Sequence, residues 1–192
     1  MHHIYHTEAL ILGSQNFGEN GKYYSLFTRD MGLILARAEG VRNISSKLRY
    51  VLVDYSHAKI DLVLGRNIWR ITSASKSSML QDIRKNKPAF QIFSNLSRLL
   101  KRLLPGEEAN QALYDDVLEG LKRLEAKKER TQLEAVEALS ALRILARLGY
   151  IGEGLAGEIA ARPWGESLIG SIESQKSKII SLVNKALRET HL

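Results

Sequence analysis

Residues 22–38 read "KYYSLFTRDMGLILARA", and this stretch decides the kind of structure expected for the first part of the chain. The side chains of 22–28 divide between two faces in alternation, as they do along a β-strand. Residues 29–32 then form a tight turn, in which Gly32 is available for a positive φ. The apolar stretch 33–38 returns as a second strand. The sequence therefore predicts a β-hairpin.

Further strands flank this hairpin on both sides. A short apolar run at 8–13 precedes it, and the alternating stretch 57–65 is followed, after a turn, by 68–72. Together these segments make about five strands with short turns in roughly 70 residues. A set of this size closes best as a small barrel, because closure leaves no exposed edge strand.

The pattern changes near residue 80, where helical periodicity replaces alternation. After Pro88, apolar residues recur three or four positions apart, at Phe93, Leu96, Leu100 and Leu103. We therefore expect an α+β protein with two domains. The first, 1–80, is a five-stranded barrel, and the second, 81–192, is all-α.

Three more helices are expected, over 107–128, 131–150 and 167–192, with a glycine-rich connector before the last. Thr131 is the expected N-cap of the middle helix, and Glu134, three residues later, would complete a capping box. Gly149 is the expected stop of that helix.

Composition limits the functions that the chain can have. The chain has 192 residues, a net charge of +7 and no cysteine. The lack of cysteine excludes disulfides, thiolate zinc sites and cysteine nucleophiles, and it agrees with a cytoplasmic location. No apolar run approaches the roughly 20 residues of a membrane span, and no signal peptide is expected. Residues 1–80 hold ten cations and six acids, so they carry more than half of the net charge. A basic excess suggests an anionic partner.

No set of residues predicts catalysis. The serines have no histidine and carboxylate arranged with them, and His57 stands alone in a strand pattern, which is typical of a packed or surface histidine. Asp115 and Asp116 are neighbours on a helix and point about 100° apart, so a solvated face is expected. We predict no enzyme, no metal and no cofactor.

The connection between the third and fourth expected strands is basic. This basic loop, residues 39–49, reads "EGVRNISSKLR". Arg42, Lys47 and Arg49 in the loop and Arg37 just before it lie within thirteen residues. Several of them could contact the phosphate backbone of one nucleic-acid strand. Composition alone is equally consistent with cations that are simply exposed to solvent and bind no partner. Residues 45–46, both serine, either cap a turn that aims these cations or merely space them.

The helical part has cationic faces of its own. Arg98, Lys101 and Arg102 share one face opposite the apolar stripe, and Arg143 and Arg147 lie one turn apart. A cationic rim beside an apolar groove suits an acidic peptide with an apolar end. A solvated helix face is the alternative.

Five segments of the chain together carry a resemblance to a known family. They are "TEALILG" (7–13), "LFTRDMG" (26–32), "AEGVRNISSKLR" (38–49), "LVLGRNIWRIT" (62–72) and "ALRILARLGYIGE" (141–153). In this order they resemble the RecO family of bacterial recombination mediators. The resemblance covers about residues 5–75, and the helix ending in Leu-Gly-Tyr adds to it.

The resemblance implies an OB-fold barrel followed by a helical domain. It also implies binding of single- and double-stranded DNA, annealing of complementary strands, and help in loading RecA onto DNA coated by single-stranded-DNA-binding protein (SSB). The implied partners are RecR and the acidic C-terminal tail of SSB, and the implied location is cytoplasmic, at the nucleoid. Many members carry a four-cysteine zinc module after the Leu-Gly-Tyr helix, whereas residues 151–167 here contain no cysteine.

The resemblance assigns a DNA-facing role to Arg42, Lys47 and Arg49, which match the basic loop of the family. Arg37, Lys22 and Arg66 are further candidates as cations of the same barrel. The tentative partner-binding residues are Arg98, Lys101, Arg102, Arg143 and Arg147. Two other functions remain open on the residues alone, namely a protein-interaction adaptor and an RNA-binding module without annealing activity.

Overall fold

The structure, a computed structural model, describes residues 3–152 and 154–189. The chain divides into two compact units. One comprises residues 1–81 together with 104–111, and the other comprises 82–103 together with 112–192. The sequence predicted domains of residues 1–80 and 81–192. The short segment 104–111, which follows the first long helix, nevertheless belongs to the first unit, and no feature of the sequence indicated this.

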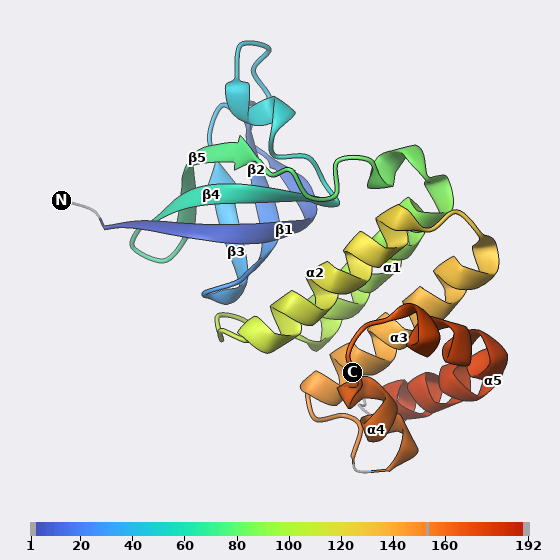
Figure 1. Cartoon of the computed structure of the whole chain (residues 1–192). Coiled ribbons are helices and arrows are strands. Elements are labelled where there is room, and N and C mark those ends of the chain that lie inside the picture. The colour runs from blue at the N-terminus through green and yellow to red at the C-terminus, as the bar shows by residue number, and fades with distance from the viewer. Residues whose placement is uncertain (1–2, 153, 190–192) are drawn as a thin grey trace. The chain divides into compact units, whose positions relative to one another are not determined.

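The first unit is a closed five-stranded barrel, as expected, and its strands follow the order β1-β2-β3-β5-β4 (Figure 1). All neighbours are antiparallel except β3 and β5, which run parallel. This architecture is the OB-fold. The strands are β1 (Ile4–Phe17), β2 (Gly21–Thr28), β3 (Gly32–Ala38), β4 (Ser56–Leu64) and β5 (Trp69–Lys76).

The long strand β1 closes the barrel because it serves two neighbours. Its first half pairs with β4 and its second half with β2. The register with β2 shifts between Ile11 and Gly13, and Gly13 has a φ of 140° that favours glycine. A bulge of this kind bends a strand and so lets β1 curve from one neighbour to the next.

Alternating side chains from every strand fill the barrel, as expected for a sheet closed on itself. Tyr24 and Trp69 are the largest of them, and both are almost completely buried. Burial of these apolar groups is the main source of stability for a unit of this size. The core also contains Ala9, Ile11, Leu26, Ile34, Ala36, Ala38, Val41, Leu52, Ala58, Ile60, Leu62 and Ile71.

The turn between β2 and β3 confirms the predicted hairpin. Gly32 has a φ of 71°, and the Thr28 hydroxyl donates to the Gly32 carbonyl at 2.9 Å. The segment 104–111 lies against this turn, where the Leu33 N–H donates to the Gly106 carbonyl at 2.9 Å. A Cβ atom at Gly32 would lie 2.2 Å from the carbonyl oxygen of Glu108, so the close approach requires glycine.

The second unit is helical, as expected. Helix α3 packs against α1, α4 and α5 and contributes buried residues from most of its length. Within the described residues, no helix is long and apolar enough to cross a membrane. The helices are α1 (Lys87–Leu103), α2 (Gln111–Ala126), α3 (Arg130–Arg147), α4 (Leu155–Ala161) and α5 (Glu166–Glu189).

The two ends of α3 give opposite outcomes for the predicted caps. Thr131 is not the N-cap, because the helix already begins at Arg130, and Glu134 binds Lys176 and Arg130 instead of a backbone N–H. Gly149, by contrast, ends the helix as predicted. It has a φ of 78°, and its N–H donates to the Ala146 carbonyl at 3.1 Å.

Helix α1 begins where Asn86 caps it. The Asn86 side-chain oxygen accepts from the Ala89 N–H at 3.3 Å, and its amide donates to the Lys127 carbonyl at 2.8 Å. Pro88 therefore lies in the first turn, where its missing N–H costs no helical hydrogen bond.

Candidate nucleic-acid interface

The β3–β4 connection, residues 39–55, projects from the barrel and contains the basic loop (Figure 1). Consecutive backbone hydrogen bonds shape it. The Asn43 N–H donates to the Gly40 carbonyl, and the Ser46 N–H donates to the Asn43 carbonyl, both at 3.1 Å. Gly40 takes a φ of 61° at the first of these turns. The main chain itself thus holds the loop, and the Ser46 side chain forms no capping hydrogen bond.

A short 3-10 helix, η1 (Lys47–Tyr50), contains the two predicted DNA-binding residues Lys47 and Arg49, as well as Tyr50. In a 3-10 helix three residues complete a turn, so its side chains point in three directions. Leu48 packs against the barrel core and anchors the helix. Arg49 points into a hollow beside the barrel, and Lys47 and Tyr50 lie one turn apart on the remaining side.

That hollow, here called the cationic hollow, has a volume of about 340 Å³. Three predicted DNA-binding residues line it, namely Lys22 from β2 and Arg42 and Arg49 from the β3–β4 connection. Lys22 lies 20 residues before Arg42 in the sequence, so separate segments supply the three cations to one concave surface. The other lining residues are Asn16, Tyr24, Val41 and Leu52.

Backbone and hydroxyl oxygens fix two of these cations. Arg42 Nη1 donates to the Gly18 carbonyl at 3.2 Å, and the Arg42 N–H donates to the Asn20 carbonyl at 3.0 Å. Lys22 Nζ donates to the Ser14 hydroxyl at 3.3 Å. These acceptors are uncharged, so they orient the two side chains without neutralising them. Among residues 3–152 and 154–189, no carboxylate forms an ion pair with Lys22, Arg42 or Arg49.

Tyr24 adds a neutral hydroxyl to the wall of the hollow. Its O–H donates to the Leu52 carbonyl at 3.3 Å. Burial, helped by the negative charge of Asp54, raises the pKa of Tyr24 to about 12. The phenol therefore remains protonated at physiological pH and adds no negative charge to an anion-binding surface.

The other three predicted DNA-binding residues lie outside the hollow. Lys47 is exposed on η1, and Arg66 is exposed in the turn between β4 and β5. Arg37 on β3 is half-buried. Its Nη2 atom lies 2.6 Å from a carboxylate oxygen of Glu39, and its guanidinium carbon lies 4.0 Å from the centre of the Phe17 ring. The charge of Arg37 is thus largely balanced by its own neighbour.

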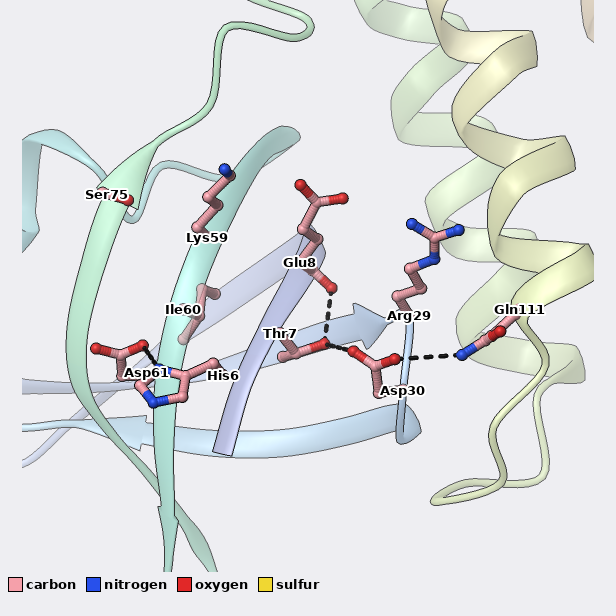
Figure 2. Close-up of a pocket in the computed structure, with 10 residues that line it drawn as sticks. All are labelled: His6, Thr7, Glu8, Arg29, Asp30, Lys59, Ile60, Asp61, Ser75 and Gln111. Carbon is pink, nitrogen blue, oxygen red and sulfur yellow. Dashed lines mark hydrogen bonds and ion pairs between the residues drawn. The ribbon is translucent and has the colours of Figure 1, made fainter. Parts of the chain in front are cut away.

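A second hollow on the barrel unit, of about 650 Å³, shares no lining residue with the first (Figure 2). Thr7 and Gln111 both donate to the Asp30 carboxylate, at 2.7 and 3.3 Å. His6 Nδ1 lies 2.6 Å from Asp61 Oδ1. The carboxylates of this hollow, Glu8, Asp30 and Asp61, outnumber its Arg29 and Lys59, so it is unsuited to a phosphate chain.

The predicted partner-binding cations of the second unit divide into two groups. Arg98, Lys101 and Arg102 are exposed together on α1. Arg143 on α3 is instead buried, with 4% of its side chain exposed. It bonds Asp116 at 2.6 Å and lies 4.6 Å from the Trp164 ring centre.

Asp116 corrects an expectation drawn from the sequence. We expected a solvated aspartate, but only 10% of its side chain is exposed, and its two oxygens bind Arg143 and Arg147 at 2.6 and 2.7 Å. The interhelical ion pairs, which periodicity within one helix cannot reveal, account for the difference. Arg147 remains 45% exposed.

A groove of about 880 Å³ lies beside Arg147. Ile151, Gly152, Gly154 and Gly157 of the glycine-rich segment line it, and Ala160 and Ala161 of α4 add apolar surface. Arg143 also lines this groove, but its charge is paired with Asp116.

The sequence interpretation missed two exposed apolar residues of the β3–β4 connection. Ile44 is 83% exposed and Tyr50 is 62% exposed. The available signal was the place of Tyr50 at the end of "SKLRY", directly after the cations and before the next strand.

Fold and surface together define an OB-fold protein with a C-terminal all-α domain and a cation-lined hollow beside its longest barrel connection. Two family models match the chain, "Recombination protein O N terminal" over residues 1–79 and "Recombination protein O C terminal" over residues 89–152. The chain belongs to the RecO family.

Curated relatives agree with this assignment. A protein of Heliobacterium modesticaldum named "DNA repair protein RecO" is 30% identical over 150 residues, which are 78% of this chain and 53% of the relative. A protein of the same name from Caldanaerobacter subterraneus is 27% identical over 145 residues, 76% of this chain and 58% of the relative. The chain thus spans little more than half the length of the curated relatives it matches.

Proposed function

We propose that this protein is a mediator of recombinational DNA repair that binds single- and double-stranded DNA and anneals complementary strands. The observation that supports the proposal best is the cationic hollow, in which Lys22, Arg42 and Arg49 gather beside an OB-fold barrel. None of the three forms an ion pair with a carboxylate in the part of the chain that the structure describes. OB-folds commonly bind nucleic-acid strands with their barrel face and loops.

The proposed mechanism is electrostatic. Each cation that meets a phosphate releases condensed counterions, which supplies affinity without preference for sequence. When the positive surface lowers the mutual repulsion of two strands, base pairing between them completes the annealing. No step of this kind makes or breaks a covalent bond, so the proposed role requires no catalytic residue and no cofactor.

The helical unit would recruit partners. We assign RecR and the acidic C-terminal tail of SSB as partners and expect RecA to benefit indirectly, through loading onto SSB-coated DNA. The groove beside Arg147 offers apolar surface and one half-exposed cation for an acidic peptide with an apolar end. The exposed face formed by Arg98, Lys101 and Arg102 offers a second acidic-peptide surface.

Annealing assays on two matched triple variants test the proposal. One variant removes Lys22, Arg42 and Arg49, and the other removes Arg98, Lys101 and Arg102, so both lose three positive charges. We expect the hollow variant to lose annealing of bare complementary oligonucleotides and the helix variant to retain it. The helix variant should instead bind an SSB-tail peptide more weakly.

Equal loss in both variants would mean that net charge alone matters, and the hollow would not be the DNA site. If the unmodified protein binds the acidic peptide but no oligonucleotide, the protein is an adaptor. Stronger binding of RNA than of DNA strands of equal length would favour an RNA-binding module.

A further inference from the structure

Tyr50 is an exposed aromatic residue beside the cationic hollow, and the fold gives it no internal role. The residue is 62% exposed, and it lies at the end of η1, next to Arg49. Large aromatic side chains dominate the energetics of protein interfaces because they bury much apolar area with few rotatable bonds. A tyrosine held at the surface by a hydrogen-bonded turn is therefore suited to contact a flat ligand.

The helix η1 sets the direction of this ring. Leu48 anchors η1 to the barrel core, and Arg49 turns toward the hollow. Residues three apart in a 3-10 helix are eclipsed, so Lys47 and Tyr50 project from the same side, next to the direction of Arg49. One turn of chain thus presents an arginine to the hollow and, beside it, a lysine paired with an aromatic ring.

This alternation of cation and ring matches the chemistry of an unpaired nucleic-acid strand. Such a strand presents phosphates along one side and the faces of its bases along the other, and proteins that bind it combine a cationic groove with aromatic stacking platforms. In a duplex the base faces are stacked on one another and are not accessible to the ring. Phosphates, by contrast, are accessible in both forms.

We propose that Tyr50 stacks on an unpaired base of the DNA strand held by Lys22, Arg42 and Arg49, and thereby makes the barrel prefer single strands over duplex. The inference rests on the proposed DNA-binding function and adds a residue that reads the state of the strand. The ring contributes stacking, the three cations contribute affinity for phosphate, and Lys47 neutralises the phosphate next to the stacked base.

Abasic oligonucleotides provide the test, because they keep the phosphates and lack the bases. We expect the unmodified protein to bind an ordinary oligothymidylate roughly 5-fold or more tightly than an abasic strand of equal length. Tyr50→Ala should lose this preference and bind duplex DNA as before, and Tyr50→Phe should keep it because the ring remains. An oligonucleotide containing 2-aminopurine should show a change in fluorescence on binding Tyr50→Phe but little change on binding Tyr50→Ala.

The outcomes separate this inference from the function on which it rests. If Tyr50→Ala binds DNA and distinguishes ordinary from abasic strands as the unmodified protein does, the stacking role is wrong while DNA binding stands. If the unmodified protein binds no oligonucleotide, the proposed function fails and the stacking role with it. Thermal unfolding of Tyr50→Ala should match that of the unmodified protein, because the ring lies outside the core.

Discussion

The guanidinium of Arg143 donates to the carboxylate of Asp116 at 2.6 Å, and both side chains are almost completely removed from solvent. The pair joins α2 to α3 across 27 residues of sequence. Arg143 was predicted from the sequence to bind a partner, but its guanidinium is buried inside the helical unit. Substitutions at this ion pair should therefore change the stability of the protein rather than its binding to partners.

We predict that Asp116→Ala lowers the free energy of unfolding by about 3 kcal/mol, because it leaves the Arg143 charge buried without its carboxylate. Arg147→Ala is the control. Its side chain is 45% exposed, and loss of such a pair should cost less than about 1 kcal/mol. Urea unfolding followed by circular dichroism measures both, and equal costs would contradict the structural assignment.

The hairpin turn provides a second stability test. Gly32→Ala should destabilise the protein by about 2 kcal/mol or more, because the new Cβ would lie 2.2 Å from a backbone oxygen of Glu108 and the residue has a φ of 71°. Gly18→Ala has a similar φ of 55° but meets no atom within 4 Å, so it should cost only about 1 kcal/mol of backbone strain. The difference between their melting temperatures isolates the contact with residues 104–111.

Because of Tyr24, the free energy of unfolding of the barrel should fall as the pH rises above about 10. Burial raises its pKa from 10.0 in the unfolded chain to about 12 in the folded one, so the folded state holds the proton more tightly. The resulting stabilisation is complete below about pH 10 and is lost as the pH rises toward 12. Tyr24→Phe should unfold with less dependence on pH over this interval, and an unchanged profile would show that Tyr24 is not the group responsible.

Binding of DNA should weaken steeply with salt. On single strands the logarithm of affinity falls with the logarithm of salt concentration, with a slope of about −0.7 for each phosphate contact. Removal of Lys22, Arg42 and Arg49 together should therefore make the slope shallower by about 2. Arg66 lies outside the hollow, so Arg66→Ala should change the slope by less than the value of about 0.7 expected for one phosphate contact. Fluorescence anisotropy at several salt concentrations measures all three proteins.

Local patterns predicted most of the fold. The hairpin of residues 22–38, the change to helical periodicity near residue 80 and the end of α3 at Gly149 each depend on neighbours in sequence. The cap at Thr131 failed because Glu134 found partners on its own helix and on α5, which compete with a capping box. Local propensity decides a helix start only when no tertiary partner takes the side chains involved.

The site was predictable in part. The basic loop indicated Arg42 and Arg49, but their meeting with Lys22 depends on the pairing of β2 with its neighbours and on the path of a 17-residue connection. No spacing rule gives such a path. The burial of Asp116 was equally hidden, because its partners lie on another helix.

The parallel seam between β3 and β5 has a consequence for how the barrel opens. It is joined by only two residue pairs, Ala36 with Trp69 and Arg37 with Arg70, whereas the other strand pairs run for seven residues or more. Amide hydrogens along this seam should exchange with solvent water sooner than those of β1 and β4, because less structure must separate to expose them. The barrel is thus expected to loosen first where β3 meets β5, at the strand that leads directly into the basic loop.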